Sequence, residues 1–327
     1  METFPATDFS LQCSFLWCRT AERDTLRHMP HSRRLGAEML LLAITVIWGG
    51  TFIITKSGLE HISPTLLIGM RFLVAFVVVT VLGAHRLRTM TGSTLRRGAI
   101  LGILLCASYL MQTTGLLFTT ASRSGFITYL YAVLIPPFQF LILRRPASRW
   151  NLAGLAIVLI GILFLTQPAA GEINAGDLLT IGCAIGVALY IIYLDRFSRI
   201  EDPANLVIVQ FGVTAAVALG LSAAIHPIIP QRLTLTIDLV VAIAYLAVLG
   251  TVVALGVQNR FQRETTPVRA TIIFAFEPVF AALFGVLAGE PFGPSQATGA
   301  ALVIAGLLVS ELSGLRNVRR RLQRVPR

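Results

Sequence analysis

Charged side chains are scarce in this sequence. Asp, Glu, Lys and Arg together make up 13% of the 327 residues, whereas hydrophobic residues make up 55%, and the mean hydropathy is +0.76. An ordinary soluble domain carries about 25% charged residues. The composition therefore excludes a conventional soluble globular domain.

Sequence motifs for nucleotide and metal chemistry are also missing. No glycine-rich loop precedes a Lys-Ser or Lys-Thr pair, so nothing indicates ATP as an energy source. The five histidines fall in tails or near loops and form no HExxH motif. Cys13 and Cys18 lack a second ligand pair for zinc, and Cys106 and Cys183 are isolated in apolar stretches. We expect no cofactor and no metal site.

Ten apolar stretches make up most of the chain. A bilayer core about 30 Å thick is crossed by a helix of about 20 residues. The predicted spans are residues 36–55, 64–84, 95–118, 123–143, 149–167, 176–194, 204–225, 238–258, 267–288 and 295–311. We therefore predict an all-α integral membrane protein with ten transmembrane helices.

The basic residues predict the orientation in the membrane. The formal net charge is +11, from 27 basic and 16 acidic residues. With the N-terminus in the cytoplasm, 23 basic residues lie inside, Lys56, Arg123 and Arg232 lie outside, and Arg71 lies within a span. The positive-inside rule thus predicts a protein of the plasma (inner) membrane with both termini in the cytoplasm. This distribution points to the lipid bilayer, not to nucleic acid, as the partner of the basic residues.

The two ends of the sequence flank the membrane part. Residues 1–35 are predicted to form a cytoplasmic leader, and residues 314–327 a basic cytoplasmic tail. The leader fits a signal peptide poorly because it contains Glu22 and Asp24. We expect Met29 to be the true start, because it gives a more compact chain with Arg33 and Arg34 directly before the first span. A genuine disordered tail is the alternative to translation from Met29.

An internal repeat divides the membrane part into residues 36–167 and 168–313. A proline within an apolar run recurs after 142 residues, at Pro136 and Pro278. Two glycines in the next apolar run recur after 145 residues, as Gly154 and Gly161 and then Gly299 and Gly306. Each half has five spans, so the second half is inverted relative to the first. Inverted repeats are typical of secondary transporters, with a substrate site near mid-membrane.

Several motifs resemble the EamA-type transporters of the drug/metabolite transporter superfamily. They are WGGTF at 48–52, RF at 71–72, SGFI at 124–127 followed by LIP at 134–136, EP at 277–278 and GEP at 289–291. The first repeat departs from the family in carrying Arg144 and Arg145 where a Gly-Glu pair is frequent. The resemblance implies ten helices and export or exchange of small metabolites. A channel-like facilitator and a membrane-embedded enzyme remain alternatives, although the acid, base or metal cluster that an enzyme needs is not found.

Arg71 and Glu277 are the ionisable residues deepest in the predicted spans. At 1.5 Å per residue, Glu277 lies about 15 Å beyond Pro267 and Arg71 about 10 Å beyond Pro64. A charge facing lipid costs at least about 2.5 kcal/mol, so both side chains should face the interior of the bundle. We predict that the two residues form a pair that binds substrate or a proton, which would couple transport to protons. The alternative is that they form a structural clamp.

Polar-edged side chains within the spans are further candidates for contact with a small-molecule substrate. Tyr109 and Gln112 are three residues apart and share a helix face. Such a lining suits an amphipathic or zwitterionic solute, although packing with a satisfied hydrogen bond is the alternative for each residue. The five candidates are Trp48, Tyr109, Gln112, Tyr129 and Tyr131.

Three prolines within the spans are candidate hinges. Pro136, Pro137 and Pro278 each remove an amide donor and free the carbonyl group four residues earlier. A freed carbonyl can bind a cation or a substrate ammonium group, and the kink can serve as a gate. A kink without any binding role is the alternative.

Overall fold

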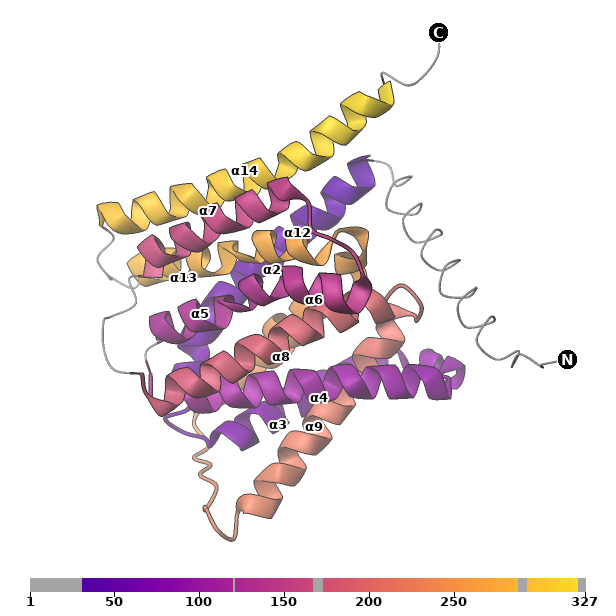
Figure 1. Ribbon diagram of the computed structural model, residues 1–327. Coiled ribbons are helices and arrows are strands. Elements are labelled where there is room, and N and C mark those ends of the chain that lie inside the picture. Colours follow the sequence, from indigo (N-terminus) through magenta and orange to yellow (C-terminus); the bar gives the residue numbers. More distant parts are fainter. Residues whose placement is uncertain (1–30, 120, 167–172, 288–292, 323–327) are drawn as a thin grey trace, which may run out of the picture.

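A computed structural model describes residues 31–119, 121–166, 173–287 and 293–322 (Figure 1). Within these ranges every regular element is a helix, and the one β-type contact is an isolated antiparallel bridge between Ile62 and Leu233. The long helices form a bundle in which α7 (Arg149–Thr166) and α14 (Pro294–Leu322) lie along one side. Helices α3 (Pro64–Leu82) and α9 (Pro203–Ile225) pack together at the other side.

The remaining elements fill the space between these two sides. In the first half of the chain (residues 31–166) they are α2 (His31–Gly58), η1 (Ala84–Thr89), α4 (Gly92–Gly115), α5 (Ala121–Tyr129) and α6 (Tyr131–Leu143). In the second half (residues 173–322) they are α8 (Ala175–Phe197), α10 (Ile237–Ala244), η2 (Tyr245–Val253), α11 (Ala254–Phe261), η3 (Gln262–Glu264), α12 (Pro267–Phe274) and α13 (Phe276–Leu287).

Helices occupy the predicted apolar stretches, but three stretches are not continuous α-helices. The stretch at 123–143 is divided into α5 and α6 at Leu130, and the stretch at 267–288 is divided into α12 and α13 at Ala275. The stretch at 238–258 contains η2, a π-helix of nine residues, between α10 and α11. Hydropathy predicts that a segment is buried in lipid but does not predict which helical hydrogen bonds it makes, so the sequence did not reveal these irregularities.

Two predicted boundaries lie inside helices. α2 begins at His31, five residues before the predicted first span, and α14 continues to Leu322 through most of the predicted tail. Hydropathy marks only the apolar part of a helix, and a helix can extend beyond it. Residues 1–30 with Met29, the break at 290–291 and the last five residues lie outside the described ranges.

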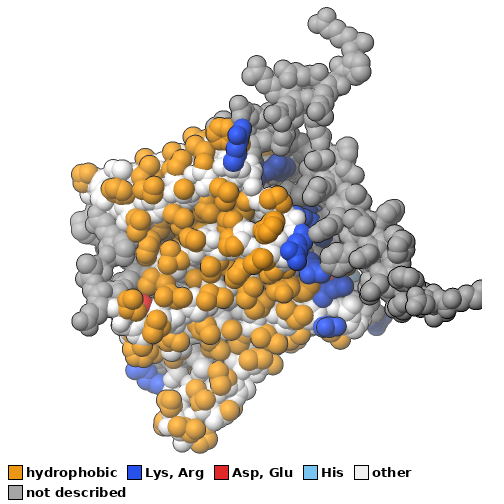
Figure 2. Space-filling view, in the orientation of Figure 1, with side chains coloured by type: hydrophobic (Ala, Val, Ile, Leu, Met, Phe, Trp, Pro, Cys, Tyr) orange, Lys and Arg blue, Asp and Glu red, His pale blue; other side chains and the backbone are white. Residues whose placement is uncertain are grey.

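Seven described helices are long and apolar enough to cross a membrane, and α7 and α14 contain shorter apolar helices. The seven are Arg33–Gly58, Pro64–Leu82, Gly92–Gly115, Ser124–Leu143, Ala175–Phe197, Pro203–Ile225 and Ile237–Glu264. Figure 2 shows hydrophobic side chains covering the broad flank of the bundle and Lys and Arg gathered mainly at one end of it. An apolar flank of this extent is what a surrounding bilayer requires.

Glycines allow α7 and α14 to cross at close range. A Cβ atom on Gly154 would lie 2.5 Å from the carbonyl oxygen of Gly306, and one on Gly161 would lie 2.8 Å from that of Gly299. The order of these contacts makes the two helices antiparallel. The repeated glycines are therefore packing positions between the two halves, as expected for small residues in membrane bundles.

One end of the bundle, which we call the arginine-rich end, contains the start of α2 and the α6–α7, α8–α9 and α11–α12 connections. Three buried carboxylates there, Glu38, Asp195 and Glu264, each contact arginines at 2.6–3.4 Å. The partners are Arg34 and Arg269 for Glu38, Arg145 and Arg199 for Asp195, and Arg33 and Arg260 for Glu264. These pairs join segments of both halves.

The opposite end is held by backbone contacts between the α2–α3 and α9–α10 connections. The amide of Ser63 donates to the carbonyl of Arg232 at 3.0 Å, and the amide of Thr234 donates to the carbonyl of His61 at 2.8 Å. The Arg232 guanidinium donates to the carbonyl of Leu59 at 2.5 Å. The halves thus meet at this end as well, through partly exposed polar groups and a small apolar cluster that includes Ile62 and Leu239.

Candidate functional site

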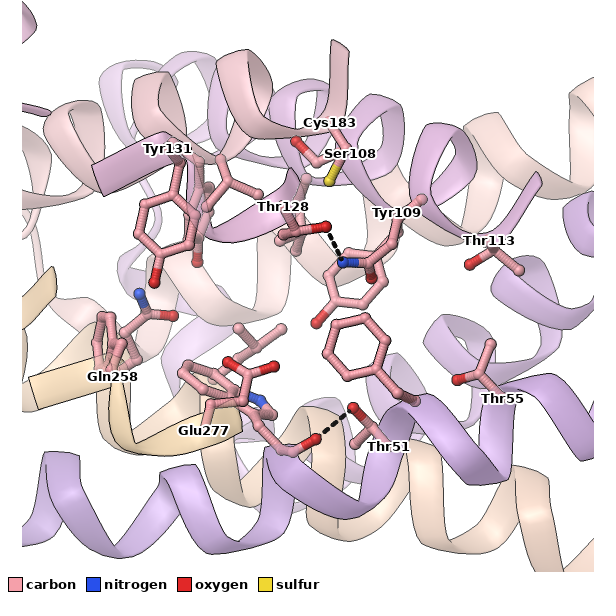
Figure 3. Close-up of a pocket in the computed structure, with 18 of the residues that line it drawn as sticks. Thr51, Thr55, Ser108, Tyr109, Thr113, Thr128, Tyr131, Cys183, Gln258 and Glu277 are labelled. Atoms are coloured by element: carbon pink, nitrogen blue, oxygen red, sulfur yellow. Dashed lines mark hydrogen bonds between the residues drawn. The ribbon is translucent and has the colours of Figure 1, made fainter. Parts of the chain in front are cut away.

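A cavity lies between the two halves of the chain, from the middle of the bundle toward the opposite end. Its volume of about 100 Å³ holds several water molecules, each needing roughly 10–15 Å³. Figure 3 shows that hydroxyl, amide and aromatic groups surround it. The polar and aromatic residues of the lining are Trp48, Thr51, Phe52, Thr55, Arg71, Ser108, Tyr109, Gln112, Thr113, Thr128, Tyr131, Cys183, Tyr190, Gln258, Phe274 and Glu277.

Glu277 supplies the carboxylate of the cavity. It follows the break at Ala275 as the second residue of α13, and α13 packs against α2 at Gly49. A Cβ atom on Gly49 would lie only 3.1 Å from the Glu277 carbonyl oxygen, so the glycine permits this contact. Within the described ranges no group donates a hydrogen bond to the Glu277 carboxylate. A half-buried carboxylate that lines a cavity without a protein partner is available to a proton or to the cationic group of a solute.

Arg71 lines the same cavity from α3 and is 2% exposed. Its Nε donates to the hydroxyl of Thr251 at 2.6 Å, and one Nη donates to the carbonyl of Gly250 at 3.2 Å and to the hydroxyl of Tyr109 at 3.4 Å. The guanidinium carbon also lies 4.6 Å from the centre of the Tyr109 ring. Arg71 and Glu277 form no salt bridge. The cavity therefore holds a guanidinium group and a carboxyl group that do not contact each other.

The π-helix η2 presents the groups that hold Arg71. The hydroxyl of Thr251 donates to the carbonyl of Leu246, five residues earlier, at 2.7 Å. The carbonyl of Gly250 accepts a second hydrogen bond, from the indole of Trp48 at 3.3 Å. A Cβ atom at Gly250 would lie 3.3 Å from Arg71 Nη2, so the glycine lets the guanidinium approach. π-Helical segments inside α-helices are frequent at functional sites.

Four of the five polar-edged candidates line the cavity. Trp48 stacks edge-to-face on Phe274, with ring centres 5.4 Å apart. Tyr109 and Gln112 both face the cavity from α4, and Gln112 donates to the hydroxyl of Thr128 at 3.1 Å. Tyr131 faces it from α6 (Figure 3).

Tyr129 is the exception among these candidates. Its ring is buried, it is not among the residues that line the cavity, and its hydroxyl donates to the carbonyl of Thr271 in α12 at 2.8 Å. This bond joins the two interrupted stretches, α5–α6 and α12–α13. In this structure Tyr129 therefore packs in the interior, and its hydroxyl group has a hydrogen-bond partner.

The candidate hinges do not coincide with the helix breaks. Pro136 and Pro137 lie inside α6, after the break at Leu130, and Pro278 is the third residue of α13, after the break at Ala275. None of the three lines the cavity. Each proline nevertheless follows a break within two turns, so the irregular backbone precedes the proline in both stretches.

Comparison with known proteins adds the family. The model of the EamA-like transporter family matches residues 35–167 and, a second time, residues 174–312. The chain belongs to the EamA-like transporter family. The resemblance in the short motifs is thereby confirmed, and the chain is a multi-pass membrane transporter. The two matches correspond to the two halves of the bundle.

Relatives of this EamA-like chain carry transporter names. A protein of Archaeoglobus fulgidus named "Uncharacterized transporter" is 29% identical over 281 residues, which are 86% of this chain and 87% of that protein. A "Probable amino-acid metabolite efflux pump" of Salmonella typhimurium is 26% identical over 287 residues, 83% of this chain and 93% of that protein. A crystal structure with 22% identity and a TM-score of 0.71 covers 85% of this chain and 98% of that one, and it shares the fold.

A layer of amides at the arginine-rich side of the cavity of this EamA-like transporter was not predicted from the sequence. Tyr190, Gln210 and Asn259 form a closed ring of hydrogen bonds at 3.0–3.3 Å. Gln258 donates to Gln262 at 2.9 Å. These side chains lie toward the arginine-rich end, and amides within apolar stretches were the feature of the sequence that could have revealed them.

Proposed function

We propose that this EamA-like chain is a secondary active transporter that exports or exchanges small amino-acid-like or other amphipathic solutes. The observation that carries the proposal is one cavity lined by a guanidinium group, Arg71 from the first half, and a carboxyl group, Glu277 from the second, with no salt bridge between them. A zwitterionic solute complements it, because its ammonium group can pair with the carboxylate and its carboxylate with the guanidinium. The name of the Salmonella typhimurium relative, an amino-acid metabolite efflux pump, supports the same class of solute.

The proposed architecture has ten transmembrane helices in two five-helix halves of opposite orientation, residues 36–167 and 168–313. Two matches of one family model support the duplication. The helix contacts support the inversion: α8 packs against α4 and α5–α6, as α2 packs against the α10–α11 stretch and α12–α13. The antiparallel α7–α14 contact pairs Gly154 with Gly306 and Gly161 with Gly299, so exchanging the halves exchanges the two contacts. Inverted repeats hold their substrate at the interface between the halves.

The proposed mechanism is alternating access. The lining reaches Thr55 and Thr113, in the last turns of α2 and α4 before the opposite end. Toward the arginine-rich end, the amide layer and the ion pairs of Glu38, Asp195 and Glu264 close the bundle. The arginine-rich end is cytoplasmic by the positive-inside rule, which also puts both termini in the cytoplasm of a plasma-membrane protein. Access from the cytoplasm then requires these ion pairs to separate.

Proton coupling follows from the position of Glu277. A carboxylate without a protein partner binds either a proton or the ammonium group of the solute, and each displaces the other. Protons entering the cell down their gradient can thus drive the solute outward. This exchange would supply the energy for export without ATP.

The test is transport by purified protein in proteoliposomes under an imposed pH gradient, with radiolabelled neutral amino acids as solutes. Wild type should accumulate a transported solute above its equilibrium level. Glu277→Gln should reconstitute in equal amount and lose at least ten-fold of the gradient-driven accumulation. Glu60→Gln, which alters an exposed carboxylate near the opposite end, is the matched control and should transport like wild type.

Other outcomes separate the alternatives. Full gradient-driven transport by Glu277→Gln refutes the proton role. Equilibration of solute without accumulation in wild type identifies a channel-like facilitator. Aggregation of both Glu277→Gln and Arg71→Ala in detergent assigns the two charges to a structural clamp.

A further inference from the structure

A second cavity, which we call the arginine pocket, lies at the arginine-rich end between the end of α3, the start of α9 and α11. Its volume of about 720 Å³ is several times that of the central cavity. Four guanidinium groups line it, from η1, the α8–α9 connection, α11 and η3, and apolar side chains of α3 and α9 form a wall. The arginines are Arg86, Arg199, Arg260 and Arg263.

Arg263 is the arginine of this pocket that has no carboxylate of the described residues within salt-bridge distance. The other three each pair with a carboxylate at 2.6–2.9 Å. Arg263 donates one hydrogen bond to the carbonyl of Ser198 at 3.0 Å, and no carboxylate of the described residues forms a salt bridge with it. Glu201 and Asp202 also line the pocket, but Arg97 and two hydroxyl groups engage the former and Arg86 engages the latter. The pocket can therefore accept an anion at Arg263.

The apolar wall determines what kind of anion fits. Val79 and Leu82, on the last turn of α3, lie beside the arginines, and Leu82 is 74% exposed. α3 packs on α9 at the outer side of the bundle, where lipid surrounds a membrane protein (Figure 1). A soluble phosphate has no apolar part that could pack on this surface, whereas the acyl chains of a phospholipid would cover it.

We propose that the arginine pocket binds the phosphodiester headgroup of an anionic phospholipid, with Arg263 as the anchor and Leu82 against the acyl chains. Guanidinium groups bind phosphate oxygens through paired hydrogen bonds, and basic pockets between transmembrane helices suit anionic headgroups. The pocket joins α3 of the first half to α9 and α11 of the second. A bound lipid would therefore stabilise the contact of the halves, whatever solute the central cavity takes.

The test is the melting temperature of the full-length protein in detergent, titrated with phosphatidylglycerol, with phosphatidylcholine or with soluble glycerol phosphate. Phosphatidylglycerol should raise the melting temperature of wild type, and the two other additions should leave it unchanged at equal concentration. Arg263→Gln should weaken the half-saturating phosphatidylglycerol concentration by at least ten-fold. Arg88→Gln removes the same charge from η1 outside the pocket and should respond like wild type.

Leu82→Asn provides a second test, because an exposed side chain can be changed without disturbing the fold. It should also weaken the response to phosphatidylglycerol. Equal responses of Arg263→Gln and Arg88→Gln would overturn the proposal, since the effect would then reflect overall charge. A full response to glycerol phosphate would overturn it in favour of a soluble phosphate ligand.

Discussion

At the arginine-rich end the halves meet through three buried carboxylates that contact six arginines. At the opposite end they meet through a small apolar cluster and a few hydrogen bonds of partly exposed groups, without a buried charge. Separating a carboxylate buried in the protein from its arginines costs free energy, because the charge is left without a partner until water enters. Exposed backbone bonds are replaced by water at little cost. In the proposed orientation and mechanism, the end that opens to the cytoplasm is thus the one that resists opening, and binding of a solute or a proton in the cavity would have to offset that resistance.

Loss of a buried carboxylate at the arginine-rich end should have the largest effect. Asp195 is fully buried and contacts Arg199 at 2.6 Å and Arg145 at 3.4 Å. Asp195→Ala should lower the free energy of unfolding by up to about 3–5 kcal/mol, because two partly buried guanidinium groups, 10% and 22% exposed, lose their carboxylate. Reversible unfolding in mixed micelles measures this. Glu60→Ala, at an exposed carboxylate near the opposite end, is the control. An equal loss of unfolding free energy in both variants would contradict the difference between the two ends.

Between the two ends, packing rather than charge should determine stability. Gly154→Ala introduces a Cβ atom 2.5 Å from the carbonyl oxygen of Gly306, and we expect a loss of about 1–3 kcal/mol. The fall in melting temperature in detergent measures this loss. Gly220→Ala in α9 is the matched control, because no atom lies within 4 Å of the added methyl group. Helix propensity alone favours alanine over glycine, so Gly220→Ala should melt at the temperature of wild type or slightly above it. A similar fall for both variants would contradict the role of the α7–α14 contact.

The opposite end should respond weakly to substitution. Ser63 accepts a hydrogen bond from the amide of Arg232 at 2.8 Å. Ser63→Ala should lower the free energy of local opening by about 1 kcal/mol or less. The bridging amides of Arg232 and Thr234 should then exchange up to about five-fold faster. Hydrogen exchange read by mass spectrometry measures it, with Ser57→Ala as the control in the last turn of α2. An effect as large as that of Asp195→Ala would remove the distinction between the ends.

The smallest effect concerns Glu201, between α8 and α9. The hydroxyl of Thr94, at 2.6 Å, holds the pKa of this carboxyl below its ordinary value, aided by Ser93 and Arg97. A lowered pKa adds stability above the unfolded pKa of about 4.3 and loses it as the pH falls through the folded pKa. Thr94→Val should therefore be less stable than wild type at pH 7, and the difference should shrink in acid. Melting curves at each pH measure this difference. Thr94→Ser keeps the hydroxyl group and should melt like wild type at every pH. A difference for Thr94→Val that does not change with pH would contradict the role of Glu201.

Much of the fold could be predicted because lipid imposes a simple rule on sequence. Each helix must be apolar over about 20 residues, so the helical stretches follow directly from hydropathy. The same rule singled out Arg71 and Glu277, since a charge within such a stretch has to face the interior. Both indeed line one cavity, together with Trp48, Tyr109 and Tyr131.

What the sequence did not predict depends on contacts between distant segments. The π-helix η2 offers its carbonyl and hydroxyl groups to Arg71 and Trp48, which lie about 180 and 200 residues away. Arg71 was expected near Glu277, but local geometry gives it Thr251 and Gly250 instead. The break at Ala275 lies within the turn that Pro278 constrains, whereas the break at Leu130 lies six residues before Pro136, beyond the turn that this proline constrains.

The α7–α14 crossing has a consequence for how such a bundle can arise. Its two glycine contacts exchange places when the proposed halves are exchanged, so each half presents the same surface to the other. A surface that complements itself is what a two-fold symmetric homodimer uses. A single five-helix chain inserted in both orientations would meet its own copy through this contact. Fusing the two genes would then fix the stoichiometry and let α10–α11 acquire its π-helix on one side only.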